Sequence, residues 1–358
     1  MGGAPIGPSR ARLNALCVMR HAPCGGCITY VDRPRGHGVM SAPPRHHLLD
    51  GSSGCISYWE WGAPDGPPIV LIHATGFHAR VWGQTVAHLP LTYRIVSVDM
   101  RGHGHSAKNG LLLDWSLVAD DVSELMAHLA LDAAIGVGHS MGAHCLSQVA
   151  LAHPGAFARL LLIDPVMLEP GRYAVGVPAP AGVPTAAGVP APADPQRHPV
   201  ARRRDHWAGW EAFYQHLQDR HPYALWQPKA LEDYCRHGLR PSTDGDGFRL
   251  ACPPVMEASV YMGAVHSCLY GRLKDITAPV TILRAKGPEP GDDRRMDFAV
   301  SPTWPDLHTE FQDAVDVSVP HLSHFIPMQD PALTAHFIQH PGATARQAVA
   351  ASNKAQGG

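Results

Sequence analysis

The sequence predicts an α/β protein with a doubly wound, mostly parallel sheet and a helical lid subdomain inserted before the last strands. Short runs of Val, Ile and Leu alternate with segments of helical length, as expected where helices cover both faces of a parallel sheet. After Asp164 the alternation stops, and it resumes at Val280 about 110 residues later, a gap too long for a structureless loop inside a compact domain. The inserted stretch is therefore predicted to be folded.

The predicted core begins with two short strands around a Gly-Ser-Ser-Gly turn and continues as alternating strands and helices. The predicted strands are 46–50, 55–61, 69–73, 94–99, 134–137, 160–163, 280–283 and 315–319. The predicted core helices are 81–88, 115–129, 140–152 and 332–338. Inside the insertion, helical segments are predicted at 207–217, 230–237 and 255–265.

Composition divides the chain into a core and three other parts. Residues 1–44 are rich in Gly, Pro, Ala and Arg, and we expect a disordered extension, with Met40 as a candidate natural start. Residues 45–165 and 276–340 form the predicted core, and residues 166–275 form the predicted lid, whose first part repeats Gly-Val-Pro-Ala-Pro. Residues 341–358 are predicted to be a flexible tail.

Charge and cysteine content exclude several classes of protein. The chain has 358 residues, a formal net charge of -2 and no long run of Lys and Arg, so no nucleic-acid partner is predicted. No apolar stretch reaches the roughly 18 residues of a membrane-spanning helix, and no secretory signal peptide is apparent. The 8 cysteines are too sparse for a disulfide framework, which favours a cytoplasmic protein. Cys24 and Cys27 lack a second ligand pair, so no metal site is predicted.

The run Gly138-His139-Ser140-Met141-Gly142 fits the G-x-S-x-G pattern. It lies between a predicted strand and a predicted helix, which is the context that this motif requires. The glycines leave room for a tight, strained turn, and the start of a helix points backbone N–H groups at a developing oxyanion. Ser140 is therefore the predicted nucleophile.

A serine hydroxyl needs a base that takes its proton. Of the 24 histidines, His324 is the predicted base because it lies between the last strand and the last helix, and His321 is the alternative. The backbone N–H groups of Thr75, which follows the third strand, and of Met141 are the predicted oxyanion donors. The polar turn at 99–106 is interpreted as structural, with no share in the chemistry.

These motifs resemble those of the α/β-hydrolase superfamily, specifically its capped, lipase- and esterase-like serine hydrolases. The resemblance spans about residues 45 to 340. It rests on the elbow around Ser140 and on three more segments, which are His73-Ala-Thr-Gly76, Asp99-Met-Arg-Gly-His-Gly104 and His324-Phe-Ile-Pro327. The resemblance implies that the insertion is a mostly helical lid and that its tryptophans form a pocket wall. Ala74 departs from the glycine that is usual in the family.

The resemblance leaves the acid partner of His324 open. The usual position in the family falls near Pro288, which cannot act as an acid. Asp164, at the end of the strand at 160–163, stands where some relatives carry the acid and is the predicted partner. The alternatives farther along the chain are Glu289, Asp292, Asp293 and Asp297.

These observations predict a serine hydrolase that cleaves small or medium carboxylic esters through an acyl-enzyme on Ser140, without a cofactor. Lactone hydrolysis, carbon–carbon bond hydrolysis of a diketone and perhydrolysis are compatible with the same triad. A rival of another class is a ligand-binding protein of this fold with little turnover. The natural substrate and the oligomeric state are left open.

Overall fold

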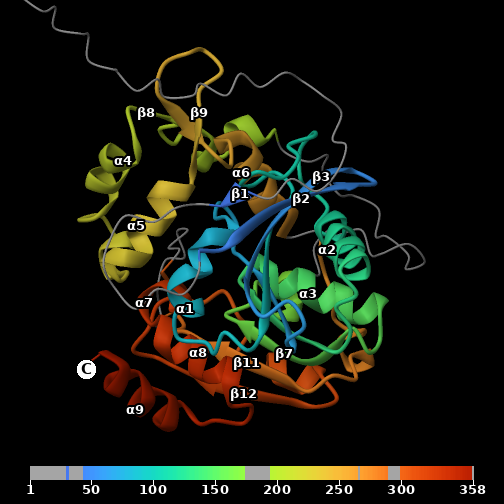
Figure 1. Cartoon of the computed structure of the whole chain (residues 1–358). Coiled ribbons are helices and arrows are strands. Elements are labelled where there is room, and N and C mark those ends of the chain that lie inside the picture. Colours follow the sequence, from blue (N-terminus) through green and yellow to red (C-terminus); the bar gives the residue numbers. More distant parts are fainter. Residues whose placement is uncertain (1–29, 32–42, 174–193, 265–266, 289–298, 357–358) are drawn as a thin grey trace, which may run out of the picture.

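The computed structural model describes residues 30–31, 43–173, 194–264, 267–288 and 299–356. Its centre is a sheet of nine strands (Figure 1). In their order across the sheet, the strands are β1 (Tyr30–Val31), β2 (Arg45–Gly51), β3 (Gly54–Gly62), β5 (Arg94–Asp99), β4 (Pro68–Ile72), β6 (Ala134–His139), β7 (Phe157–Ile163), β11 (Val280–Arg284) and β12 (Ala314–Ser318). The six strands from β5 to β12 run parallel, and β1, β2 and β3 pair antiparallel. The predicted mostly parallel sheet is confirmed.

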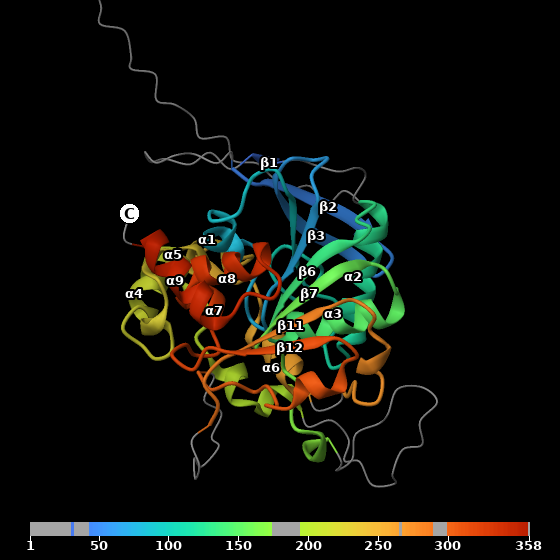
Figure 2. The same ribbon diagram turned by 90° about the horizontal axis from the view of Figure 1, so that it is seen from below.

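Helices cover both faces of the sheet (Figures 1 and 2). On one face lie α2 (Ser116–His128) and α3 (Met141–Ala152). The other face carries the 3₁₀ helix η1 (Ala79–Trp82), α1 (Gly83–Val86), α7 (Ile326–Gln329), α8 (Pro331–Gln339) and α9 (Ala345–Gln356). Side chains of β4 alternate between the two faces, because Ile69 and Leu71 pack with one buried cluster and Val70 and Ile72 with the other. The fold is therefore doubly wound, as predicted.

The register of the parallel strands brings the predicted site residues to one edge. Gly138 of β6 pairs with Ile72 of β4 and with Leu162 of β7. The next residue on β6, His139, pairs with Ile163. Since all these strands run in the same direction, the segments that follow them leave the sheet at the same carboxyl edge.

The segment between β7 and β11 holds helices and a second, small sheet. Its helices are η2 (Pro170–Arg172), η3 (Pro195–Arg197), η4 (Pro199–Arg202), α4 (Trp210–Leu217), η5 (Tyr223–Leu225), α5 (Pro228–His237), α6 (Pro254–Gly263) and η7 (Leu273–Asp275). The small sheet, which the sequence did not predict, has the order β8 (His206–Trp207), β10 (Phe248–Leu250) and β9 (Leu239–Pro241). We call residues 164–279 the β7–β11 segment.

The start of α4 differs from the prediction of a helix at 207–217. Trp207 lies in β8 and pairs with Phe248, and the helix begins only at Trp210, after the N-cap Gly209.

At the other end of the segment, α6 is held to the core by two hydrogen bonds. Leu112 N donates to Ser259 Oγ (2.9 Å), and Trp115 Nε1 donates to the carbonyl of Val260 (3.0 Å).

The predicted flexible tail at 341–358 contains a helix, α9. Thr344 and Gln347 form a capping box at its start, because Thr344 N donates to Gln347 Oε1 (2.9 Å) and Gln347 N donates to Thr344 Oγ1 (3.4 Å). Ala348 is fully buried, and Ser352 Oγ donates to Asp330 Oδ1 (2.6 Å). The alanine-rich composition, which suggested a frayed tail, instead supplies helix propensity and small residues that pack closely.

Several sequence-based predictions lie outside the described residues. These are the disorder of residues 1–29 and 32–42, the start at Met40, the Cys24 and Cys27 pair, the Gly-Val-Pro-Ala-Pro repeats, and the candidate acids Glu289, Asp292, Asp293 and Asp297. Within the predicted extension, the described residues Tyr30–Val31 pair with β2 and add an edge strand to the sheet.

Within the described ranges, no helix is both long and apolar enough to cross a membrane. In the same part of the chain, no group of three or more His, Cys, Asp or Glu side chains is arranged to hold a metal ion.

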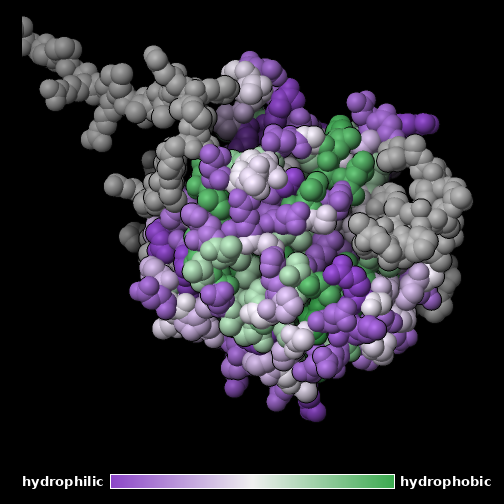
Figure 3. Space-filling view, turned by 90° about the vertical axis from the view of Figure 1, so that its right-hand side faces the viewer, coloured by the Kyte–Doolittle hydropathy of each residue, from purple (hydrophilic) through white to green (hydrophobic). Residues whose placement is uncertain are grey.

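On the face seen in Figure 3, hydrophilic residues surround scattered hydrophobic ones. Among the described residues, the large exposed hydrophobic ones are Leu91, Leu111, Leu225, Phe248 and Val315. Scattered exposed residues of this kind are ordinary on protein surfaces.

Asp330 joins two helices, so its removal tests how firmly α9 is held. Its Oδ1 accepts hydrogen bonds from Leu333 N (2.8 Å), at the start of α8, and from Ser352 Oγ on α9. We expect Asp330→Ala to lower the free energy of unfolding by about 2 kcal/mol, measured by urea denaturation, because a helix cap and the partly buried acceptor of the Ser352 hydroxyl are lost. The control Asp65→Ala, in an exposed turn, should stay within about 0.5 kcal/mol of the wild type. Equal stability of the two variants would contradict this account.

Candidate active site

Ser140 occupies a strained turn between β6 and α3. Its φ is 59° and its ψ is -119°, a left-handed conformation that residues other than glycine rarely adopt. A Cβ at Gly138 would lie 2.5 Å from Ala143 N, and a Cβ at Gly142 would lie 2.6 Å from the carbonyl oxygen of His73. Glycine is therefore required on both sides of Ser140, which is the elbow that the G-x-S-x-G pattern predicted.

The structure brings together the predicted nucleophile, base and acid from three separate loops. His324 Nε2 lies 2.9 Å from Ser140 Oγ, and His324 Nδ1 lies 2.6 Å from Asp164 Oδ2. The exposed fractions of Ser140, His324 and Asp164 are 5%, 7% and 0%, so the three side chains are shielded from water. With Nδ1–H donating to the carboxylate, Nε2 is left as the acceptor for the serine proton.

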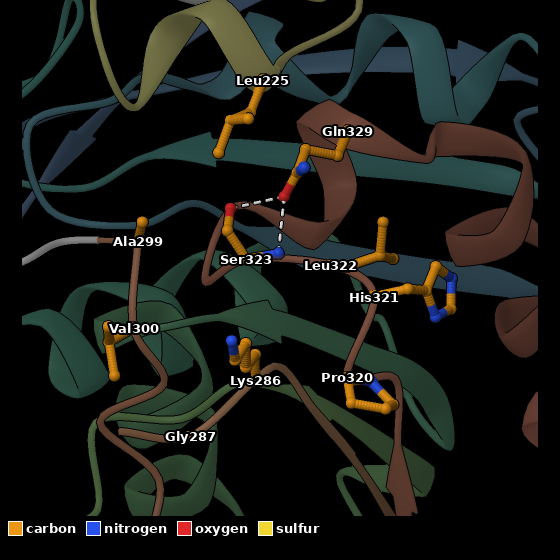
Figure 4. A pocket seen from close by; sticks show the side chains of 10 residues that line it. All are labelled: Leu225, Lys286, Gly287, Ala299, Val300, Pro320, His321, Leu322, Ser323 and Gln329. Carbon is orange, nitrogen blue, oxygen red and sulfur yellow. Dashed lines mark hydrogen bonds between the residues drawn. The ribbon is translucent and has the colours of Figure 1, made fainter. Parts of the chain in front are cut away.

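His321, the alternative base, lies elsewhere. It is exposed and lines a cavity of about 360 Å³ formed by the loops after β11 and β12, by α7 and by Leu225 (Figure 4). Its ring points away from Ser323 and Gln329, whose hydrogen bonds are drawn at the centre of that view. The histidine in contact with Ser140 is His324.

Asp164 is held at the end of β7 by the loop that follows β11. Its φ of 45° is left-handed, and its backbone N–H donates to the carbonyl of Leu283 (2.7 Å). The oxygen that does not face His324, Oδ1, accepts hydrogen bonds from Ala285 N (2.9 Å) and from Ser301 Oγ (2.6 Å). Ser301 Oγ in turn accepts from Thr303 N (3.2 Å). These donors fix the position and orientation of the carboxylate.

The two predicted oxyanion donors lie side by side. Thr75 follows β4, Met141 is the first residue of α3, and Thr75 Oγ1 lies 3.6 Å from Met141 Sδ. Both residues are buried. The loop that carries Thr75, residues 73–77, is called the oxyanion loop below.

Two buried histidines, which the sequence interpretation did not use, orient the oxyanion loop. Gly76 N donates to His103 Nε2 (3.0 Å), and His103 Nδ1 donates to the carbonyl of Arg101 (3.0 Å). His73 Nε2 accepts from Met100 N (3.1 Å). Burial lowers the pKa of His73 to about 4 and that of His103 to about 3, so both are neutral acceptors at pH 7. The polar turn at 99–106 thus contacts the oxyanion loop through Met100 and His103.

His139 is a further site residue that the sequence did not identify. Its Nε2 donates to the carbonyl oxygen of His324 (2.8 Å), which ties β6 to the loop that carries the base. Burial, together with the nearby His324, lowers the pKa of His139 well below its usual range. In the sequence, His139 occupies the first variable position of the G-x-S-x-G pattern. The pattern specifies no residue type there, so it does not indicate a role for His139.

Aromatic side chains from three parts of the chain surround Phe77 of the oxyanion loop. Its ring centroid lies 5.4 Å from Trp226 and 5.3 Å from Tyr234, both in the β7–β11 segment. It lies 6.0 Å from Phe325 and 6.1 Å from His139. The β7–β11 segment therefore packs directly on the loops that carry the oxyanion donor and the base.

Comparison with known proteins identifies the family of this chain. Residues 69–337 match the sequence profile described as the alpha/beta hydrolase family. The chain belongs to this family. A non-heme chloroperoxidase of Streptomyces lividans is 35% identical over 128 residues, which is 34% of this chain and 46% of the relative. A pimeloyl-[acyl-carrier protein] methyl ester esterase of Methylococcus capsulatus is 39% identical over 102 residues, which is 27% of this chain and 37% of the relative.

The matched regions thus span less than half the length of these two curated relatives. Among solved structures, this α/β hydrolase resembles an E-2-(acetamidomethylene)succinate hydrolase, with a TM-score of 0.65 and 22% identity over 83% of this chain and 98% of the other. It also resembles an esterase of Thermogutta terrifontis, with a TM-score of 0.56 and 18% identity over 82% of this chain and 96% of the other. At this level of identity, the likeness establishes the fold alone.

The Ser301 hydroxyl provides a test of how Asp164 is held. We expect Ser301→Ala to lower kcat for an ester about tenfold and to leave KM nearly unchanged, because a charge-assisted hydrogen bond to Asp164 is lost. Steady-state kinetics measure both constants. Ser123→Ala, which removes a 2.8 Å hydrogen bond to the Ala119 carbonyl within α2, is the matched control and should retain wild-type kcat. If both variants lost the same activity, Ser301 would have no specific role.

Proposed function

We propose that this α/β hydrolase cleaves small to medium carboxylic esters through an acyl-enzyme on Ser140. The observation that carries the proposal is the continuous chain of contacts from Ser140 Oγ through both ring nitrogens of His324 to Asp164. Each contact lies within hydrogen-bond distance, and the order of groups matches nucleophile, base and orienting acid. The methyl ester esterase among the relatives supports the same class of substrate.

In the proposed mechanism, His324 Nε2 takes the proton from Ser140 as Oγ attacks the ester carbonyl carbon. Asp164 holds the imidazole in the required tautomer and stabilises the imidazolium that forms. The imidazolium then protonates the leaving alkoxide, and the alcohol departs. Water, deprotonated by His324, attacks the acyl-enzyme, and Ser140 regains its proton when the acid is released.

The N–H groups of Thr75 and Met141 are proposed to bind the oxyanion that forms in each step. Ser140 directly precedes α3, a helix of 12 residues, so the positive end of the helix dipole faces the same place. The neutral His73 and His103 keep the oxyanion loop in position before substrate binds. Donors that are fixed in advance need no reorganisation when charge develops.

The β7–β11 segment is proposed to act as a lid. Trp226 contacts both Phe77 and Phe325, at 5.4 Å and 5.2 Å between ring centroids, so the segment lies over loops on both sides of the elbow. These aromatic rings provide an apolar wall beside the nucleophile, which favours apolar acyl or alcohol groups of limited size. The predicted lid boundaries at 166–275 stay part of this proposal.

A panel of p-nitrophenyl esters of increasing chain length tests the proposed activity. We expect the wild type to hydrolyse the shorter esters and Ser140→Ala to lose the activity by a factor on the order of 10³ or more, since no nucleophile remains. A fluorophosphonate should label wild-type Ser140 and leave Ser140→Ala unlabelled. A folded wild type that neither labels nor turns over any ester would favour the ligand-binding interpretation.

The identity of the acid is tested by Asp164→Asn. We expect kcat to fall by a factor on the order of 10³ to 10⁴, because the amide favours the wrong tautomer of His324 and cannot stabilise the imidazolium. The control is Asp244→Asn, whose exposed carboxylate pairs with Arg249 (2.8 Å) in the β7–β11 segment. Near wild-type turnover of Asp164→Asn would move the acid to the group Glu289, Asp292, Asp293 and Asp297.

A further inference from the structure

A buried carboxylate lies against the oxyanion loop. Glu257, in the first turn of α6, has a side chain that is only 7% exposed. A Cβ built on Gly76 would lie 2.6 Å from Glu257 Oε1 and 2.9 Å from its Cδ, so the carboxylate packs directly on the backbone at Gly76. Gly76 is the neighbour of Thr75, the proposed oxyanion donor. The negative charge of Glu257 therefore lies beside the place where the proposed mechanism forms the negatively charged oxyanion.

The positive partner of this carboxylate is Arg203, which follows η4 in the β7–β11 segment. Arg203 Nη1 lies 2.7 Å from Glu257 Oε2, and Arg203 Nη2 lies 3.4 Å from the hydroxyl of Tyr234. Arg203 also lines a small cavity together with Gly76 and Phe77. Burial acts to lower the pKa of Arg203, but Glu257 and the nearby tyrosines raise it well above its usual range, so the guanidinium stays charged.

Four titratable groups beside the pair carry no charge at neutral pH, and the ammonium of Lys108, which acts on one of them, donates to the carbonyls of Gly104 and Ser106. The four neutral groups are Tyr223, Tyr234, Cys252 and Tyr261. Burial raises the pKa of each of them, and the nearby charge of Glu257 raises each pKa further. Within the described ranges, Arg203 is the basic side chain in ion-pair contact with Glu257. The charge of Glu257 is therefore balanced by one residue, which comes from a different element.

We propose that Arg203 is a positioning residue for the oxyanion loop, which neutralises and holds the Glu257 carboxylate packed on Gly76. The inference rests on the proposed function. An unpaired carboxylate at this place repels the oxyanion much more strongly than the neutral ester carbonyl, so its effect falls on the transition state. Through this pair, Arg203 contributes to catalysis without contacting the reacting atoms.

The test compares Arg203→Met, Glu257→Gln and the double variant R203M/E257Q with the wild type on p-nitrophenyl butyrate. Arg203→Met leaves Glu257 unpaired, and we expect kcat to fall on the order of 10- to 100-fold with less than about a threefold change in KM. Glu257→Gln removes the negative charge, so kcat should stay within about threefold of the wild type. The double variant has neither charge and should also stay within about threefold.

A merely structural ion pair predicts a different pattern, in which each single variant and the double variant lose activity to a similar extent. The matched control is Arg249→Met, which breaks contacts with Asp205 (2.9 Å) and Asp244 (2.8 Å) in the same segment and should leave kcat unchanged. Thermal melts establish that each variant is folded. If Arg203→Met does not fold, Arg203→Gln takes its place, because a glutamine also leaves the Glu257 charge unneutralised but can still donate a hydrogen bond to it.

Recovery of kcat in the double variant supports the proposal. A double variant that is folded but as slow as Arg203→Met, or a Glu257→Gln variant that loses tenfold or more, overturns it. These outcomes differ from failure of the proposed function. In that case the wild type itself neither hydrolyses the ester nor labels at Ser140, which is measured before any variant is compared.

Discussion

The close approach of α3 to the end of β4 is the constraint on which the rest of the site depends. It exists because Gly142 has no side chain where the carbonyls of Ile72 and His73 pass, and because Gly138 leaves room for the backbone at Ala143. This contact forces Ser140 into its left-handed conformation and sets Met141 beside Thr75. The nucleophile and both proposed oxyanion donors are thus placed by backbone packing.

Much of the core could be predicted from the sequence, because its signals are local. Runs of Val, Ile and Leu marked the buried parallel strands, and the predicted strand at 94–99 has the same bounds as β5. Ser140 and His324 followed from a motif and from chain order. Asp164 was one of several candidates, and the bond to His324 that favours it joins residues 160 positions apart in the chain. The distance in space between His324 and Asp164 cannot be read from the sequence.

Most of the features that were missed depend on tertiary contacts. The helix α9 is an exception, because Thr344 and Gln347 fit the local capping-box pattern, and the alanine-rich composition was interpreted as a frayed tail instead. The neutral acceptor roles of His73 and His103 depend on burial, which shifts their pKa values. The pair of Arg203 and Glu257 joins η4 to α6 across 54 positions, and neither residue belongs to a motif. The cytoplasmic location stays a prediction.

In the proposed mechanism the acid Asp164 lies at the end of β7, so the loop after β11 does not itself present the carboxylate to His324. The described ends of this loop instead hold Asp164, through the backbone N–H of Ala285 and the hydroxyl of Ser301. Two positions far apart in one loop therefore orient a single carboxylate beside His324.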